Sequence, residues 1–231
     1  MYRPEIDNSI VKGKLFENIK DNLLNQGMNV KKIIRIRDDR SVFHVFLDDG
    51  VEVKLVLFED KLQRRIQRRI KQCKFHKILY KNGVNVPKFI CCWKGESIFW
   101  KVSEWIKGIR LDEVWDYRDP IVAGGEQVAK INSTIDPETR YPLRFKDFSP
   151  ANSIWTEDKK LYIIDVDVWP DKQIDQTIVR ILIGALRSRN RALAFLEGYE
   201  KVRSTKGIRK ILERDNWTWR GHPLSESGEL L

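Results

Sequence analysis

Four polar residues stand where they could carry chemistry: Lys54, Asp147, Asn152 and Asp165. Lys54 interrupts the apolar run VEVKLVLF, and an ammonium group among core residues must reach water or meet an anion. Asp147 and Asn152 lie in RFKDFSPANSIW, and Asp165 ends the run LYIID thirteen residues after Asn152. Loops and strand ends commonly carry functional side chains on a rigid scaffold. Their order and spacing favour one shared site.

The oxygen donors in this set suit a divalent cation beside a phosphate. Mg²⁺ takes hard oxygen ligands and retains several waters, so an amide and a carboxylate can hold it together with phosphates. The second carboxylate would then orient a hydroxyl nucleophile for phosphoryl transfer. Each residue taken singly also has a structural role available: a lysine can extend to solvent, and Asp or Asn can cap a turn or bond to loop backbone.

An antiparallel sheet is predicted to hold Lys54. Apolar residues at helical spacing over 8–26 predict a first helix. Runs rich in Val, Ile and Phe predict five strands, with Asp48-Asp49-Gly50 as a hairpin turn. The strand runs are 30–37, 41–47, 51–57, 84–93 and 97–105. The predicted fold class is α+β, with a five-stranded antiparallel sheet and one helix inserted after the third strand.

That inserted helix, predicted over 61–81, carries most of the excess charge. The chain has 43 Lys and Arg against 33 Asp and Glu, a net charge of +10, and residues 61–81 hold nine basic residues and no acid. Its apolar residues recur at helical steps, at Leu62, Ile66, Ile70, Cys73 and Ile78. The basic outer face is either a solvated surface or a contact for an acidic protein, a nucleic acid or lipid headgroups.

The C-terminal half predicts a mainly helical unit. Helical stretches are expected near 111–117 and 119–135, and a long helix, apolar on one side, over 172–202. Between them, KKLYIIDVDVW predicts a short strand pair. Residues 203–231 mix basic residues with tryptophans and predict a loosely ordered tail.

Composition excludes several classes of protein. Hydrophobic residues make up 42% of the chain, which is enough for a folded core. Cys73, Cys91 and Cys92 have neither disulfide-framework nor zinc-ligand spacing, so we expect a reducing, cytoplasmic setting. No apolar run approaches the roughly 20 residues of a membrane span, and none predicts a secretion signal.

The motifs resemble those of the protein-kinase-like superfamily, in particular compact bacterial members such as aminoglycoside phosphotransferases and RIO-type kinases. VKLVLF is similar to the strand that carries the phosphate-binding lysine, and KDFSPANSIW to the catalytic loop. LYIIDVD looks like the strand that ends in the metal-binding aspartate, and SEWIKGIRLDEVW like the hinge. The resemblance spans roughly 30–202. It implies a two-lobed fold, with an N-lobe over 1–105, a C-lobe over 106–202 and the tail over 203–231.

The resemblance also implies the cofactors and the residue roles. ATP would be held by Lys54, with Ser41 and Glu104 as further nucleotide contacts. Asn152 and Asp165 would be the two Mg²⁺ ligands. Asp147 would orient the acceptor hydroxyl.

Three departures from the family pattern bear on activity. The turn before Ser41 lacks the glycines that usually cover the phosphates, so Ser41 or Arg40 would supply the donor. Phe145 stands where relatives carry His or Tyr, and Gln72 stands near the place of the glutamate that pairs with the lysine. These departures leave open an inactive kinase fold that binds an acidic partner or nucleic acid through residues 61–81.

The length of the chain after Asp165 bears on the nature of the acceptor. Only about 65 residues follow Asp165, which leaves little room for a closed pocket and favours Ser or Thr of a protein with acidic features. The alternative is a small molecule of the aminoglycoside or choline type, and the segments GVNVPKFI and AFLEGYEKV, which resemble those of phosphotransferases, support it.

Overall fold

The computed structural model describes residues 10–37, 41–59, 63–95, 98–145, 148–182, 186–214, 216–219 and 222–223. The chain divides into two compact units. Unit 1 is Met1–Lys74 with Lys88–Trp105, and unit 2 is Phe75–Pro87 with Ile106–Leu231. Across these described ranges, no helix has the length and apolar character needed to cross a membrane.

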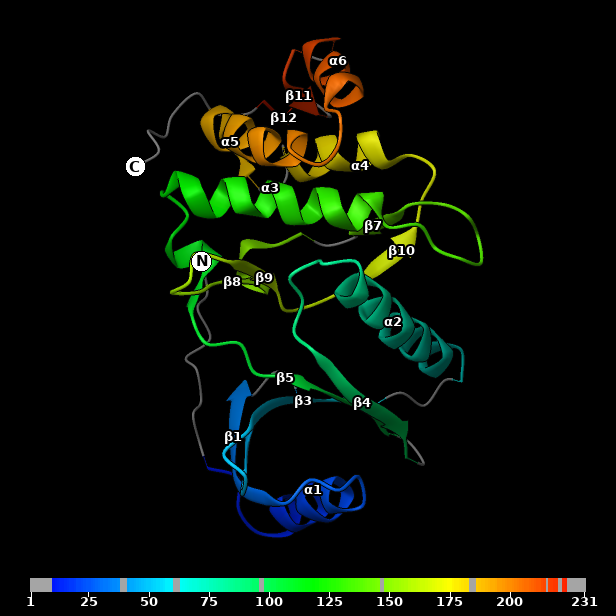
Figure 1. The fold of residues 1–231 in the computed structure, drawn as a ribbon, viewed down its shortest axis with the longest axis vertical. Coiled ribbons are helices and arrows are strands. Elements are labelled where there is room, and N and C mark those ends of the chain that lie inside the picture. Colours follow the sequence, from blue (N-terminus) through cyan, green and yellow to red (C-terminus); the bar gives the residue numbers. More distant parts are fainter. Residues whose placement is uncertain are drawn as a thin grey trace. The chain divides into compact units, whose positions relative to one another are not determined.

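Unit 1 is built on a five-stranded antiparallel sheet with strand order β1-β2-β3-β5-β4 (Figure 1). The elements in chain order are α1 (Lys14–Leu24), β1 (Val30–Arg37), β2 (Val42–Leu47), β3 (Glu52–Glu59), α2 (Gln63–Lys81), β4 (Phe89–Lys94) and β5 (Ile98–Glu104). The first part of α2 belongs to this unit. The predicted sheet, with one helix after its third strand, is confirmed.

Strand alternation gives this sheet two different faces. Val45 of β2 and Val53 and Leu55 of β3 are fully buried and share a core with Ile19 and Leu23 of α1. Successive side chains of a strand point to opposite faces. Residues 52, 54, 56 and 58 of β3 therefore point to the face opposite this core.

The first part of α2 packs on that opposite face. Ile66 and Cys73 form a small cluster with Phe99, and Phe58 packs against it. Ile70, predicted to lie on the apolar side of the helix, is 43% exposed, so that part of the prediction is wrong. Ile66 and Cys73 are seven residues apart and point in nearly the same direction, whereas the direction of Ile70 is rotated by about 40° from that of Ile66, away from Cys73, towards the edge of the buried side.

Unit 2 combines helices with short strands. Its elements are β6 (Ile109–Arg110), the 3₁₀ helices η1 (Leu111–Glu113) and η2 (Pro150–Asn152), α3 (Arg118–Ser133), β7 (Leu143–Phe145), β8 (Ser153–Trp155), β9 (Leu161–Ile163), β10 (Val168–Pro170), α4 (Ile174–Ile181), α5 (Arg189–Glu200), α6 (Lys206–Arg214), β11 (Thr218–Trp219) and β12 (His222–Pro223). The second part of α2 contributes Phe75 and Leu79 to its core.

Helices α3 and α5 lie side by side (Figure 1), and glycines form part of their contact. A Cβ on Gly125 of α3 would lie 2.8 Å from the carbonyl carbon of Phe195 and 2.9 Å from the backbone nitrogen of Tyr199 in α5. A Cβ on Gly198 of α5 would lie 2.6 Å from the carbonyl carbon of Val122 in α3. The two backbones therefore pack against each other where neither helix carries a side chain.

Two predictions for unit 2 are wrong in their connections. β9 and β10 do not pair with each other: β9 pairs with β8, and β10 pairs with β7. The single helix expected over 172–202 is two helices, α4 and α5. Arg187, just before α5, has a φ of 56°, a left-handed conformation that an α-helix cannot contain.

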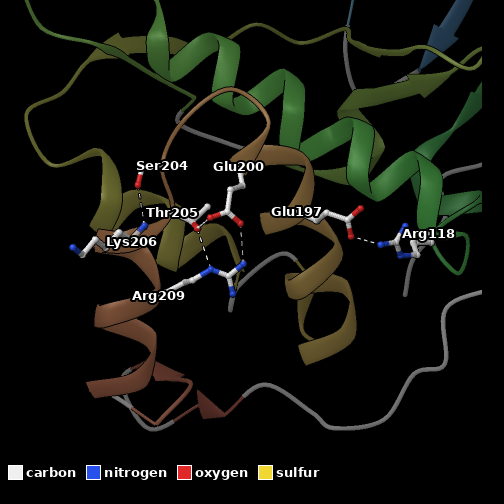
Figure 2. Close-up of polar contacts among 7 residues, drawn as sticks. All are labelled: Arg118, Glu197, Glu200, Ser204, Thr205, Lys206 and Arg209. Atoms are coloured by element: carbon white, nitrogen blue, oxygen red, sulfur yellow. Dashed lines mark hydrogen bonds and ion pairs between the residues drawn. The ribbon is translucent and has the colours of Figure 1, made fainter.

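The tail expected over 203–231 contains a packed helix. Ile208 and Leu212 of α6 are fully buried in the core of unit 2. Figure 2 shows the polar contacts at the start of this helix, where the buried Thr205 hydroxyl donates to Glu200 (2.9 Å) and accepts from Arg209 Nε (3.0 Å). The expectation of loose order is therefore wrong for 206–214.

Candidate active site

Lys54 lies in the middle of β3, on the face of the sheet opposite the α1 core. It is paired with His44 of β2 and with Ser103 of β5, and its side chain is half-buried. Its neighbours Val53 and Leu55 are fully buried on the other face. The strand therefore fixes the direction of the lysine through two anchored neighbours.

A polar and aromatic cluster surrounds the start of β3 on the same face as Lys54. His44 Nε2 lies 2.8 Å from Glu52 Oε2, and the imidazole stacks on Trp105 at 3.8 Å between ring centroids. Glu52 is one of the acids close in sequence to Lys54, and its carboxylate is bonded to His44. Single-sequence reasoning could not find this cluster, because its members come from three strands or their ends.

Gln72, which stands near the place where the family resemblance implies a glutamate, is buried in α2. Its Oε1 accepts a hydrogen bond from Arg69 Nη1 at 3.2 Å. The Arg69 guanidinium lies 4.0 Å from the ring centroid of Phe58 in β3. An amide at this position, joined to a stacked arginine, ties the helix to the sheet within unit 1.

The two further nucleotide contacts predicted in unit 1 lie at strand ends. Ser41 precedes β2, is half-buried, and its carbonyl accepts from the Leu57 backbone N–H at 2.8 Å. Glu104 ends β5, and its exposed carboxylate accepts from the Lys88 backbone N–H at 3.0 Å. The backbone N–H of Glu104 in turn donates to the Lys88 carbonyl at 2.9 Å. Glu104 thus also joins β5 to the chain that enters β4.

In unit 2 the structure brings Asn152 and Asp165 close together in the backbone. β8 and β9 are antiparallel with Ser153 opposite Ile163, and the Ile164 N–H donates to the Asn152 carbonyl at 2.9 Å. Opposed Cα atoms in such a pair are about 5.5 Å apart and consecutive ones about 3.8 Å, so Asn152 and Asp165, one and two residues beyond the Ser153–Ile163 pair, have Cα atoms roughly 9 Å apart. Asp165 is exposed and Asn152 half-buried, so both reach solvent.

The chain after Asp165 turns sharply and holds a second carboxylate. The Asp167 N–H donates to the Asp165 carbonyl at 3.2 Å, and Asp167 Oδ1 accepts from the Trp169 indole N–H at 2.6 Å. The Trp169 ring meets Phe75 edge-on at 6.1 Å. The indole therefore engages Asp167 and fixes the turn that follows Asp165.

Asp147, the predicted acceptor-orienting residue, lies outside the described residues, as does Arg40. The described chain reaches Phe145, opposite Val168, and continues from Phe148. Phe145 is buried and packs edge-on against Phe148 at 6.0 Å, and Phe148 packs against Phe195 of α5 at 5.6 Å. Phe145 is therefore held by aromatic packing, at the position where the family resemblance implies His or Tyr.

Asp171 anchors the segment that leads from β10 into α4. It accepts from the Gln173 N–H at 3.0 Å, the Thr177 hydroxyl at 3.1 Å and Arg144 Nη1 at 3.1 Å. Burial by itself would raise the pKa of this carboxyl, but the Gln173 and Thr177 hydrogen bonds and the Arg144 charge outweigh it, so its pKa is lowered. The ion pair thereby fastens β7 to α4.

Comparisons with known proteins identify the fold. No protein-family model and no curated protein matches the chain. Among solved structures, a spectinomycin phosphotransferase in complex with ADP and spectinomycin is similar with a TM-score of 0.63 and 12% identity, covering 86% of this chain and 85% of that one.

Two further phosphotransferases are similar at the same identity. ADP-bound aminoglycoside phosphotransferase APH(2'')-Ib has a TM-score of 0.58 and 12% identity, over 90% of this chain and 88% of that one. An aminoglycoside-3'-phosphotransferase of type VIII has a TM-score of 0.57 and 12% identity, over 83% and 95%. The chain therefore has the protein-kinase-like fold of the aminoglycoside phosphotransferases.

Proposed function

We propose that this protein is an ATP- and Mg²⁺-dependent phosphotransferase that moves the γ-phosphate to a hydroxyl group of a small molecule. The observation that supports it most directly is the β8–β9 pairing. It brings two oxygen-bearing side chains, Asn152 and Asp165, to neighbouring positions that reach solvent. The fold around them is shared with phosphotransferases bound to ADP.

The donor set at this pair fits Mg²⁺. Asn152 would supply an amide oxygen and Asp165 a carboxylate, both hard ligands. Among the residues described, no group of three His, Cys, Asp or Glu side chains could hold a metal ion by itself, so nucleotide phosphates and water would complete the shell. A bound Mg²⁺ would neutralise charge on the transferring phosphate.

The other assigned residues would hold the two reactants. Lys54 would bind ATP phosphates as a compact positive charge, and its two paired strand neighbours limit its freedom. Asp147 would accept a hydrogen bond from the acceptor hydroxyl and orient it for attack. Catalysis would come mainly from positioning and charge neutralisation, because phosphoryl transfer requires little covalent chemistry from the protein.

A small-molecule acceptor of the aminoglycoside type is favoured over a protein. The solved structures that are similar include phosphotransferases named for spectinomycin and aminoglycosides. They are matched over 85%, 88% and 95% of their own length, so the chain length after Asp165 gives no reason to prefer a protein. The Ser/Thr protein acceptor remains a prediction that an acceptor screen can test.

The test is γ-phosphate transfer from radiolabelled MgATP by the purified chain to a panel of aminoglycosides, choline-like alcohols and Ser/Thr-containing proteins. Asp147→Asn, Asp165→Asn and Lys54→Met should each lower turnover at least about a hundredfold, as expected on loss of a group that stabilises transferred charge. Asp158→Asn is the matched control: this exposed aspartate lies in the β8–β9 turn and pairs with Lys160. Its turnover should equal that of wild type.

The outcomes separate the alternatives. Transfer only to protein would replace the small-molecule acceptor with Ser or Thr. Equal turnover by wild type and Asp147→Asn would remove Asp147 from the mechanism. Failure of the wild type to bind MgATP, measured by calorimetry, would overturn the proposal in favour of an inactive kinase fold.

A further inference from the structure

A side-chain hydrogen bond lies just beyond Asp165, in the segment of unit 2 that links β9 to β10. Asp167 Oδ1 accepts this bond from the Trp169 indole N–H at 2.6 Å. The Asp167 backbone N–H in turn donates to the Asp165 carbonyl at 3.2 Å, across Val166. A bond between residues i and i+2 closes a γ-turn, the tightest turn of the backbone. The indole therefore holds the last residue of a turn whose first residue is Asp165.

Burial fixes this segment on one side only. Val166 is 3% exposed and Val168 is fully buried, and both belong to the core of unit 2. Asp167, between the two valines, is half-buried, and Asp165 is exposed. Packing in the core therefore anchors the backbone around Asp167, but it does not hold the Asp165 side chain. The direction of that side chain depends on the conformation of the turn.

The Trp169 side chain is itself well anchored. It lies in β10 opposite Arg144 of β7, and its ring meets Phe75 edge-on at 6.1 Å between centroids. The chain that follows is tied to the same strand, because the Asp171 N–H donates to the Pro142 carbonyl at 2.9 Å and the Asp171 carboxylate pairs with Arg144. The indole N–H is therefore a donor in a fixed place, against which the turn can be held.

The position of this bond also connects two parts of the proposed site. β9, which leads to Asp165, pairs with β8, whereas β10 pairs with β7, which ends two residues before Asp147. The turn at Val166 is the covalent link between these two strand pairs, and the Trp169–Asp167 bond spans part of it. A change in the turn would therefore move Asp165 relative to the strand that leads to Asp147.

We propose that Trp169 is a positioning residue for the metal ligand Asp165. It acts through Asp167, whose carboxylate it binds by a charge-assisted hydrogen bond, and it thereby keeps Asp165 in place beside Asn152. The inference rests on the proposed function, which makes Asp165 a Mg²⁺ ligand. Groups that orient a ligand from outside the coordination shell commonly contribute about 10–100-fold to metal affinity.

The test is binding of Mn²⁺, which also accepts oxygen ligands and is detected by electron paramagnetic resonance, to the complex of the full chain with ADP. Trp169→Phe keeps a ring against Phe75 but removes the N–H, and it should weaken Mn²⁺ binding at least about tenfold. Trp217→Phe is the matched control, because Trp217 is also half-buried and packs against the core of unit 2. It should bind Mn²⁺ like wild type. ADP binding without metal, measured by calorimetry, should be equal in all three proteins.

The route through Asp167 has a test of its own. Asp167→Ala should weaken Mn²⁺ binding at least as much as Trp169→Phe. The double variant should bind Mn²⁺ no more weakly than Asp167→Ala alone, because both substitutions remove the same hydrogen bond. The chain has eight tryptophans, and the indole signal that is lost from the ¹⁵N NMR spectrum in Trp169→Phe identifies Trp169. That signal should shift in Asp167→Ala, with no metal present.

The outcomes separate this inference from the proposed function. Equal Mn²⁺ affinity in wild type and Trp169→Phe would overturn the inference alone. Losses that add in the double variant, an indole signal that Asp167→Ala does not shift, or a parallel loss of metal-free ADP binding would do the same. Mn²⁺ binding that is absent in the wild type, or that Asp165→Asn leaves unchanged, would refute the proposed metal site and the inference together.

Discussion

Gly124 and Gly125 are neighbours in α3, and comparing alanine substitutions at the two positions separates the effect of helix propensity from that of packing against α5. Changing glycine to alanine inside a helix should gain about 1 kcal/mol from propensity alone. At Gly124 the new Cβ would meet Leu161 Cδ2 at 3.4 Å and Phe148 Cζ at 3.7 Å, which are ordinary contacts. Gly124→Ala should therefore stabilise the protein by up to about 1 kcal/mol.

At Gly125 the same substitution should be destabilising. Its Cβ would overlap the Phe195 carbonyl oxygen and lie 2.8 Å from the carbonyl carbon, so α5 would have to move by more than the 0.6 Å that the carbonyl carbon alone would require to reach the 3.4 Å found at Gly124. A backbone atom cannot rotate away from the new Cβ as a side chain could. If the helices separate instead, a gap of about 0.5–1 Å removes a quarter to a half of the dispersion energy between the atoms along their contact. Overpacking costs about 1–3 kcal/mol or more, so we expect a net loss of roughly 2 kcal/mol.

Thermal unfolding followed by circular dichroism measures both variants. In a protein of this size about 1 kcal/mol shifts Tm by 2–4 °C, so Gly125→Ala should melt about 4–8 °C below wild type and Gly124→Ala about 2–4 °C above it. Gly198→Ala, at the facing glycine, should behave like Gly125→Ala. The packing argument is refuted if Gly125→Ala melts at or above the wild-type temperature.

Two further predictions concern polar groups of unit 2. Asp171→Asn should cost roughly 1–2 kcal/mol at neutral pH. Because the folded pKa of Asp171 is lowered, its stabilisation is present above the unfolded pKa of about 3.9 and is lost as pH falls through the folded value. Urea titrations should thus show that the difference in unfolding free energy between wild type and Asp171→Asn becomes smaller below about pH 4. A difference that grew on acidification would contradict a lowered pKa of Asp171. Thr205→Val should lower the unfolding free energy by about 1 kcal/mol, because it removes a buried hydroxyl that makes two hydrogen bonds. Ser204→Ala, at an exposed position, should lower it by less. Equal losses in urea denaturation would show that burial of Thr205 does not matter.

The sheet of unit 1 could be predicted from sequence because its strands are long enough to show alternation. Val53 and Leu55 are buried while Lys54 between them is not, and this pattern is visible in VEVKLVLF. The helix predicted over 61–81 is confirmed over 63–81, and the prediction is wrong at Ile70; residues 61 and 62 lie outside the described residues. The buried side of α2 changes direction along the helix, because Ile66 and Phe75 belong to different apolar clusters. A sequence pattern that assumes one continuous apolar side cannot predict this change.

The neighbourhood of Asn152 and Asp165 could be predicted only in part. Order and residue type marked both as candidates, but their proximity depends on β8 pairing with β9, and strands of three residues carry almost no periodic signal. The same shortness led to the wrong pairing of β9 with β10. In α6, Ile208 and Leu212 have helical spacing, but the basic residues around them favour the prediction of a loosely ordered tail.

The Asn152–Ile164 hydrogen bond indicates where the chain can change in length without disturbing Asn152 and Asp165, the two proposed Mg²⁺ ligands. Their separation depends on the register of the hairpin and not on the twelve residues between them. An insertion in the turn at 156–160 would leave that register intact, at only about 0.6 kcal/mol for each doubling of loop length. A single insertion within β8 or β9 would turn every following side chain to the opposite face. Length variation that keeps the proposed Mg²⁺ ligands in register should therefore be confined to that turn.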